Sequence, residues 1–282
     1  MTRFFIIFLS LAIKAHGFIP PVTSILRDIF ESRKSTGILE LVLVHQVANS
    51  NGGWSELEER VLADPRGLKF LWKPANSSVS IAGSIEKRNY WIGTEKKVPI
   101  RSFLFLKNYL ATSAVEFRDA LISEKFLRWE QLKQFKEGFE PQGDPQSWDI
   151  KSNYIAHDSI SLVLLPTGPA IAVVGYQDAN SKRTVYFNKT GNGIKRFEWS
   201  DSGENLSWNF DPSTVSLKEG IFSKSASLNK DGREIIQSEL LVVRSLNKRQ
   251  ITDWLQSWQR GSKSLVNAPV LEESLRTLLS SR

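Results

Sequence analysis

A succession of short segments that alternate apolar and polar residues, separated by turns rich in Gly, Asn and Asp, most restricts the fold of this chain. Alternation with a period of two is typical of half-buried β-strands, and the turn residues tolerate the positive φ angles of tight connections. We expect strands at residues 38–47, 54–63, 68–72, 78–85, 89–92, 97–100, 159–165, 170–177, 184–188, 194–200, 206–210, 224–228 and 233–243. Since sequence neighbours usually pair across short connections, these strands predict two antiparallel meanders.

Two other regions have the three-and-four spacing of helices. Residues 22–34 predict an amphipathic helix before the first strand. Between the meanders, Ser113 and Glu116 have capping-box spacing, in which the Ser side chain accepts from the Glu amide and the Glu side chain reaches back to the Ser amide. The helical region that begins there extends to about residue 136 and divides near Ser123.

A last helix is expected around Trp254 and Trp258, and a Leu-rich tail follows it. The two indole rings share one helical face. Such a face packs on the protein's own sheet or, because amphipathic aromatics suit interfaces, contacts a membrane or a partner.

The first seventeen residues have the pattern of a secretory signal peptide. Arg3 precedes an apolar run at residues 4–13, and Ala15 and Gly17 place small residues at the two positions that a signal peptidase reads. The run is shorter than the roughly 20 apolar residues of a transmembrane helix. We therefore expect export to the periplasm, cleavage before Phe18 and no membrane span.

The residue types that are scarce exclude several kinds of site. The chain has no cysteine, so it forms neither a disulfide nor a lipoprotein thioether anchor. After cleavage only His45 and His157 remain, which excludes zinc sites built from Cys and His. Acidic residues form no dense cluster of the kind that holds calcium. We expect no metal and no cofactor, and we expect structural roles for both histidines.

Charge places a further limit on partners. Removing Arg3 and Lys14 with the leader lowers the formal charge of +7 by two, to +5, and the basic residues are spread along the chain. No nucleic-acid partner is therefore expected. A mildly positive surface favours anionic lipid, a lipoprotein or an envelope protein as partner; the alternative is a solvated surface that keeps the protein soluble and has no partner.

Catalytic motifs are weak. Ser84, Ser227 and Ser245 each begin a Ser-x-x-Lys sequence, but all three lie in expected strands or turns, whereas that chemistry places its serine at a helix start. There is no nucleophile elbow, P-loop or dinucleotide fingerprint. The sequence therefore predicts a protein that is not an enzyme; a hydrolase would need His45 or His157 beside a nucleophile in a cleft.

The order of these pieces resembles the periplasmic lipoprotein carriers of the LolA-like type, as a distant member. The segments that carry the resemblance are 31–34, 63–72, 173–176, 183–189, 196–199 and 225–236, together with the stretch at Asn247. It covers roughly residues 22–255. No single motif is diagnostic, so the resemblance rests on the order of the segments.

The resemblance implies an α+β fold in which a curved, incomplete antiparallel β-barrel has helices covering its concave face. It implies one half-barrel domain over residues 18–260, with a helical insertion at about 102–137 and a partly helical tail at 261–282. The helices would act as a lid, because a curved sheet that is too open to fill itself leaves an apolar groove beneath them.

The implied function is that of a chaperone-like carrier, which holds the acyl chains of a lipoprotein or lipid between sheet and lid. Sheet residues expected to face the ligand are Leu41, Leu43, Phe70, Trp72, Val174, Tyr186, Phe197 and Trp199. Lid residues expected to face it are Leu26, Ile29, Phe30, Leu121 and Phe126. The same residues fit an ordinary filled core, and which face of each strand points inward stays open.

One departure from the family pattern bears on function. The carriers have an arginine directly before the proline of the third-strand turn, where it helps to hold the lid shut, whereas this chain has Asp64 before Pro65. Either Arg66 takes over the role of holding the lid shut, or this role is lost. The alternative function is therefore an envelope protein that keeps the scaffold and binds another protein, without lipid transport.

Overall fold

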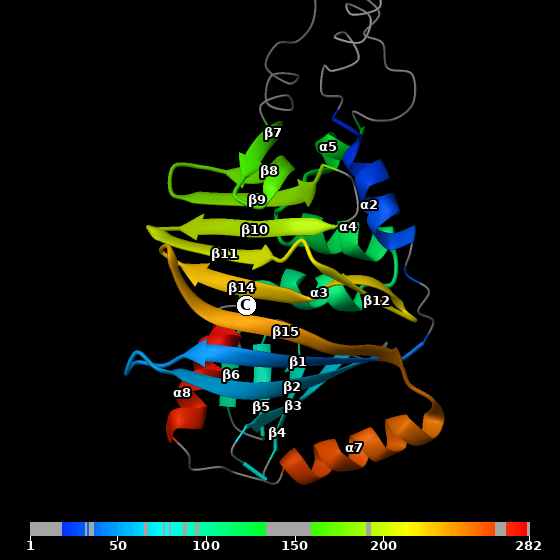
Figure 1. Cartoon of the computed structure of the whole chain (residues 1–282), viewed down its shortest axis with the longest axis vertical. Coiled ribbons are helices and arrows are strands. Elements are labelled where there is room, and N and C mark those ends of the chain that lie inside the picture. Colours follow the sequence, from blue (N-terminus) through cyan, green and yellow to red (C-terminus); the bar gives the residue numbers. More distant parts are fainter. Residues whose placement is uncertain are drawn as a thin grey trace, which may run out of the picture.

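The computed structural model in Figure 1 describes most of the chain. The described residues are 19–31, 33, 37–64, 67–75, 77–78, 80–86, 89–93, 96–133, 159–189, 193–262 and 269–280. The expected signal peptide at residues 1–17 and His157 lie outside them, as do Pro65 and Arg66. Within the described ranges, no helix combines the length and the hydropathy needed to cross a membrane.

Thirteen antiparallel strands form one curved sheet that stays open (Figure 1). The strands of the first meander are β1 (Leu39–Ala48), β2 (Trp54–Asp64), β3 (Gly67–Pro74), β4 (Ile81–Glu86), β5 (Asn89–Ile92) and β6 (Lys96–Pro99). The strands of the second are β7 (Ile160–Leu165), β8 (Gly168–Gln177), β9 (Ser181–Asn188), β10 (Ile194–Asp201), β11 (Glu204–Phe210), β14 (Ser225–Lys230) and β15 (Arg233–Ser245). Each expected strand is present, with its ends shifted by a few residues.

The two meanders join in the middle of the sheet, where β1 pairs with β15. The order of strands is β6-β5-β4-β3-β2-β1-β15-β14-β11-β10-β9-β8-β7, so β6 and β7 are its two edges. The helical region described between them, at residues 104–133, lies over the face of the sheet.

A short hairpin was not predicted from the sequence. Strands β12 (Thr214–Leu217) and β13 (Gly220–Ser223) pair with each other as a separate two-stranded sheet between β11 and β14. Each has four residues, which is too few to show alternation in the sequence. Phe222 nevertheless anchors the hairpin in the core, with its ring 6.4 Å from that of Tyr109.

Six helices are described. They are α2 (Val22–Glu31), α3 (Leu104–Leu110), α4 (Ala114–Ser123), α5 (Trp129–Lys133), α7 (Lys248–Ser262) and α8 (Pro269–Ser280). Figure 1 shows α2 to α5 gathered on one side of the second meander, as the expected lid. From the 261–282 segment, α8 packs against β1 and β6 and buries Leu275, Leu278 and Leu279 in the same core.

Aromatic side chains fill the space between the lid helices and the sheet. Phe105 of α3 lies against Trp208 of β11, with ring centroids 3.9 Å apart. Phe126, which follows α4, meets Phe197 edge to face at 5.7 Å. Because burying a large apolar side chain contributes about 1.5–3 kcal/mol, these contacts hold the helices on the concave face.

The opposite face of the sheet carries α7. Leu71 lies between Phe70 and Trp72, so its side chain points away from the main core, where it packs with Trp254 in a second apolar cluster. Trp258 Nε1 donates to the carbonyl of Gly83 at 2.8 Å. Two possibilities were left open for the tryptophan pair, and the structure shows the first of them: both rings pack on the protein's own sheet.

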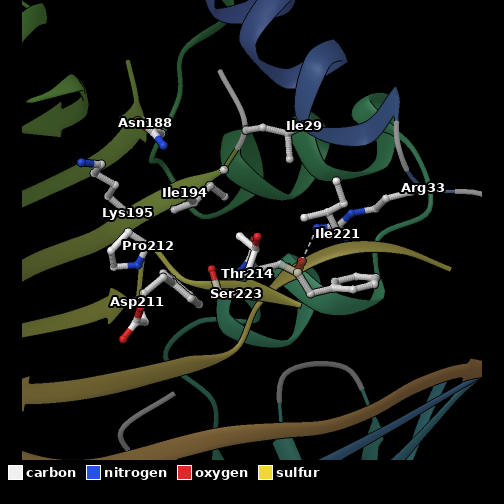
Figure 2. Close-up of a pocket in the computed structure, with 14 residues that line it drawn as sticks. Ile29, Arg33, Asn188, Ile194, Lys195, Asp211, Pro212, Thr214, Ile221 and Ser223 are labelled. Carbon is white, nitrogen blue, oxygen red and sulfur yellow. Dashed lines mark hydrogen bonds between the residues drawn. The ribbon is translucent and has the colours of Figure 1, made fainter. Parts of the chain in front are cut away.

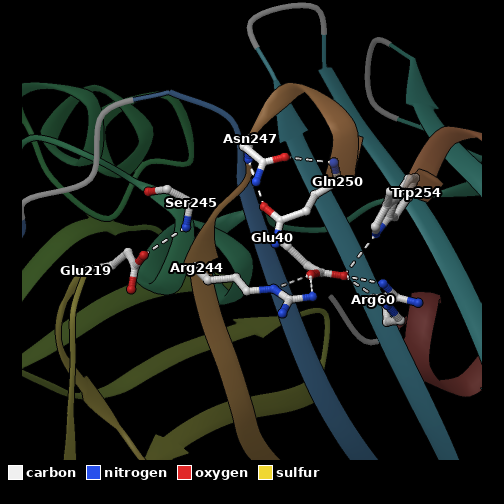
Figure 3. A network of polar contacts seen from close by, with 8 residues as sticks. All are labelled: Glu40, Arg60, Glu219, Arg244, Ser245, Asn247, Gln250 and Trp254. Atoms are coloured by element: carbon white, nitrogen blue, oxygen red, sulfur yellow. Dashed lines mark hydrogen bonds and ion pairs between the residues drawn. The ribbon is translucent and has the colours of Figure 1, made fainter. Parts of the chain in front are cut away.

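A buried carboxylate fixes α7 to this face. Glu40 is fully buried, and its Oε1 accepts from Trp254 Nε1 at 3.1 Å and from Arg60 (Figure 3). Its Oε2 accepts from Arg244 Nε at 2.8 Å. A buried charge is tolerated when every lone pair is engaged, as it is here by two guanidinium groups and an indole.

The expected capping box is half correct. Ser113 Oγ accepts from the amide of Glu116 at 3.2 Å, so α4 begins as predicted. The Glu116 carboxylate, however, reaches back to the amide of Thr112 at 2.9 Å rather than to that of Ser113. Lys107 of α3 draws it there by an ion pair, so the cap also joins two helices.

Sheet and lid approach each other closely at Gly175 of β8. A Cβ placed there would lie 2.2 Å from the backbone carbon of Phe126 and 2.4 Å from the carbonyl oxygen of Lys125. These neighbours are backbone atoms, which cannot rotate away as a side chain can. Glycine at this position therefore lets the segment after α4 lie directly on the sheet.

We predict that Gly175→Ala lowers the free energy of unfolding by about 1–3 kcal/mol, the usual cost of an overpacked contact. Urea denaturation measures it. Gly193→Ala is the matched control, because a Cβ at Gly193 meets no atom within 4 Å. Equal stability of the two variants would contradict the close approach of lid and sheet.

Candidate functional site

A hollow lies between the sheet and α3. It has a volume of about 500 Å³. Sheet residues Leu39, Ala63 and Leu68 form one wall, and Phe103, Leu106 and Leu110 form the other. Ligand pockets usually measure about 300–1,000 Å³ and are lined mainly by apolar side chains, so this cavity has the size and the lining of a binding site for an apolar molecule.

An ion pair lies at the rim of this cavity. Lys107 Nζ of α3 donates to Glu116 Oε1 of α4, and both residues border the hollow. Burial by itself would raise the pKa of Glu116, but the hydrogen bonds from Lys107 and from the Thr112 amide outweigh it and lower that pKa below its ordinary value. The pair therefore holds α3 and α4 together while Glu116 is ionised.

This pair makes the α3–α4 contact sensitive to acid. The pKa of Glu116 is lower in the folded protein than the ordinary value of 4.5, so its carboxylate stabilises the fold above that value. This stabilisation is lost as the pH falls through the folded pKa. We predict that Glu116→Gln removes this part of the acid destabilisation, measured as the free energy of unfolding between pH 6 and pH 3.

Asp119→Asn is the control for that measurement. Asp119 also lies on α4 and pairs with a neighbouring arginine, but its side chain is 54% exposed and does not reach α3. The Asp119 variant should follow the pH dependence of the unchanged protein. If the Glu116 variant does so too, the ion pair does not hold the helices together.

An arginine joins the ends of α2 and α3. Arg33, which follows α2, donates from Nη1 to the carbonyl of Ala111 at 2.9 Å and from Nη2 to that of Asn108 at 2.5 Å. Its guanidinium also stacks on the rings of Phe30 and Phe222, at 4.2 and 4.9 Å from their centroids. Charge-assisted bonds to the last carbonyls of a helix are favourable, so Arg33 holds the two lid helices together.

The sequence did not single out Arg33 for this role. The expectation from the family pattern concerned Asp64 and Arg66; the structure describes the backbone of Asp64, and Arg66 lies outside the described residues. In the part that is described, an arginine contacts the lid from α2 instead. Only the three-dimensional structure, which brings the residue after α2 to the end of α3, reveals this contact.

Most residues expected to face a ligand lie in the packed interior. Buried together in one core are Leu41, Leu43, Phe70, Trp72, Phe197 and Trp199 of the sheet and Leu26, Ile29, Phe30, Leu121 and Phe126 of the lid. Lid and sheet touch directly among them: the Phe126 and Trp199 rings meet at 6.2 Å. These residues fill the interior, and the 500 Å³ cavity is lined by other residues.

Val174 and Tyr186 lie on the other face of the sheet. Their neighbours Val173 and Val185 belong to the core instead. Tyr186 donates its hydroxyl to Glu198 at 3.1 Å, and burial together with that carboxylate raises the pKa of Tyr186 to about 12. The sequence does not show which residues of β8 face the core. This strand is buried on both faces from Ala170 to Val173, and its pairing shifts register between Val174 and Tyr176.

The cavity lining was missed for a physical reason. Leu106 and Leu110 belong to α3 and Phe103 directly precedes it, all before the predicted helix start at Ser113. A helix of seven residues makes only two turns, which is too short for its period to be read from the sequence. The apolar density of residues 103–110 is the signal that marks this wall.

The expected structural role of His45 agrees with its position in a polar row inside the core. His45 Nδ1 lies 2.7 Å from Ser238 Oγ, and its Nε2 lies 3.1 Å from Glu59 Oε2. Trp72 Nε1 donates to the other oxygen of Glu59 at 2.8 Å. The exposed fraction of these residues is 3% at most. Because they come from β15, β1, β2 and β3, the row ties four neighbouring strands together.

The order serine, histidine, carboxylate also occurs in hydrolases, but such chemistry needs an open cleft at the serine. Ser238 is instead covered within the core. Across the described ranges, no group of three or more His, Asp or Glu side chains has the arrangement of a metal site.

Comparisons with known proteins give distant likenesses. No protein-family model matches the chain, and no curated protein matches it. Among solved structures, the chain is similar to a domain of a putative outer membrane lipoprotein-sorting protein from Vibrio parahaemolyticus, with 8% identity, 83% of this chain and 97% of that chain covered, and a TM-score of 0.45. It is also similar to a LolA superfamily protein from Nitrosomonas europaea, with 11% identity, 82% and 96% covered, and a TM-score of 0.43.

An uncharacterized conserved protein from Thermus thermophilus is similar at 14% identity, with 81% of this chain and 89% of that chain covered and a TM-score of 0.26. The family named in one of these descriptions is the one that the sequence resembles. The assignment of the fold rests on this chain's own open sheet and its covering helices.

Proposed function

We propose that this protein is a periplasmic carrier that holds an apolar ligand, such as the acyl chain of a lipoprotein or lipid, in the cavity between β1–β3 and α3. The observation that carries the proposal is the cavity itself, about 500 Å³ in volume, with apolar side chains on both walls. The activity is sequestration and release, with no catalytic step.

Affinity would come from the hydrophobic effect. Each methylene group taken from water into an apolar site contributes about 0.8 kcal/mol, before the cost of ordering the chain is subtracted. Leu39 and Leu68 on one wall face Leu106 and Leu110 on the other, so an inserted chain would be enclosed by branched apolar side chains. The ion pair at the rim marks where a polar end would meet water.

Release would follow from movement of the lid. Two contacts hold α3 in place near the cavity: Arg33 ties its last carbonyls to α2, and Lys107 ties it to α4. Both are polar contacts between helices and not strand pairings, so they can break and re-form without unpacking the sheet. Lid movements of this kind govern ligand exchange in many binding proteins.

We predict that Leu68→Trp weakens the binding of a fluorescent fatty acid at least tenfold, because the indole fills the sheet wall of the cavity. A tenfold loss corresponds to about 1.4 kcal/mol of binding free energy. Fluorescence titration of the purified protein measures the affinity. Leu164→Trp is the matched control, since Leu164 is 82% exposed on β7, far from this wall in the strand order.

The control should bind as the unchanged protein does. If both variants bind fatty acid equally well, the ligand does not bind in this cavity. An unchanged protein that takes up no fatty acid at all would contradict the carrier function itself.

A second candidate function is favoured by the exposed edge of the sheet. Strand β7 ends the sheet, and it has one paired neighbour, β8, among the described strands. Leu162 and Leu164 on it are 43% and 82% exposed. An apolar edge strand offers unpaired backbone groups to a strand of another protein, which suits an envelope interaction module.

A photo-crosslinking residue placed at position 164 in living cells tests this candidate. Strand addition predicts one discrete, heavier adduct from position 164 and none from position 241, an exposed leucine in the middle of the sheet. Identical patterns at the two positions would contradict recognition through the edge.

A further inference from the structure

A second, smaller hollow lies beside Arg33. It has a volume of about 90 Å³ and is bounded by α2, α3, β10 and the β12–β13 hairpin (Figure 2). Arg33, Asn108, Thr214 and Ser223 contribute polar groups to its lining, and Ile29 contributes an apolar one. This volume is too small for an acyl chain and suits a compact polar group.

Arg33 brings a partly buried positive charge to this hollow. Within the described ranges, no carboxylate lies in ion-pair distance of its guanidinium, whose partners are two backbone carbonyls and two aromatic rings. Its Nε is buried and has no hydrogen-bond partner. Burial lowers the pKa of Arg33 to about 9, so the group remains charged at neutral pH.

The guanidinium charge of Arg33 and its unpaired Nε donor would both be stabilised by an acceptor. Buried polar groups in proteins are nearly always hydrogen-bonded, and the exceptions commonly mark a water or ion site. Arginine in particular binds the oxygens of phosphate and carboxylate groups. The unused donor of Arg33 is therefore of the type that recognises an oxyanion.

The other charged groups at the hollow are consistent with an anion. Lys195 adds positive potential, although its Nζ donates to the Thr167 carbonyl at 2.8 Å and points away from Arg33 in Figure 2. The one acidic residue of the lining, Asp211, accepts from the Ser213 amide at 2.6 Å. Figure 2 shows its carboxylate directed away from Arg33, so it does not neutralise the guanidinium.

We propose that this hollow is a subsite for an oxyanion, a phosphate or carboxylate group, which lies beside Arg33 between the lid helices and the β12–β13 hairpin. The group comes from a lipid headgroup or from free phosphate. Anion binding at this subsite goes beyond the proposed carrier function and does not require it. Since Arg33 also bonds to α3, an anion bound here holds α2, α3 and the hairpin in the closed arrangement.

Calorimetric titration of the full chain with inorganic phosphate at constant ionic strength tests the subsite. The unchanged protein should bind phosphate saturably, and Arg33→Gln should weaken binding at least tenfold. Arg27→Gln, which removes an exposed charge from the same helix, should have no effect.

A second pair of variants leaves Arg33 and its bonds to α3 in place. Thr214→Glu puts a carboxylate into the hollow and should abolish phosphate binding, whereas Thr214→Gln, of the same size but uncharged, should retain it. This pair keeps the proposal testable even if the Arg33 variant fails to fold.

Two short-chain lipids separate the sources of the anion. Dihexanoyl phosphatidic acid and dihexanoylglycerol share their acyl chains and differ in the phosphate. Binding of the phosphatidic acid at least tenfold more tightly than both dihexanoylglycerol and phosphate assigns the subsite to a headgroup; equal binding of phosphatidic acid and phosphate assigns it to the free ion.

The proposal is overturned if phosphate shows no saturable binding and phosphatidic acid binds no better than dihexanoylglycerol. It is also overturned if Thr214→Glu binds phosphate as Thr214→Gln does. Binding of dihexanoylglycerol reports on the acyl cavity alone, so failure of the carrier function is distinguished from failure of the subsite.

Discussion

The pairing of β1 with β15 is the contact on which the rest of the structure depends. These strands come from opposite ends of the sheet-forming sequence, and among the described strands theirs is the pairing that joins the two meanders. Both faces of the pair carry a side-chain bond between directly opposed residues: His45 with Ser238 on the core side, and Glu40 with Arg244 on the other. Without this pairing, each meander would be a separate open sheet with its apolar face uncovered.

The placement of the helices follows from that union. A sheet of thirteen strands that stays open has a large apolar face to cover, and the chain covers it with the helices described between the two edge strands. The helix α3 occupies the centre, with Phe105 against Trp208. One side of α3 borders the apolar cavity, and Asn108 of the same helix borders the small polar hollow. One helix thus separates an acyl-sized space from an anion-sized one.

The sequence predicted the strands well because alternation and turn chemistry are local properties. It predicted the lid helices and the open, helix-covered sheet by resemblance. It did not predict which residues line the cavity, since one wall comes from α3, whose seven residues are too few for a helical period to be read. The role of Arg33 and the hairpin around Phe222 depend on contacts between distant segments, which no local pattern records.

The position of a bound acyl chain tests the central claim most directly. A crystal structure of the protein with a fatty acid brominated along its chain would locate the ligand by the anomalous scattering of bromine. We expect bromine between Leu68 of the sheet and Leu106 of α3, inside the 500 Å³ cavity. Bromine elsewhere on the molecule, or an empty cavity in crystals grown with excess fatty acid, would contradict it.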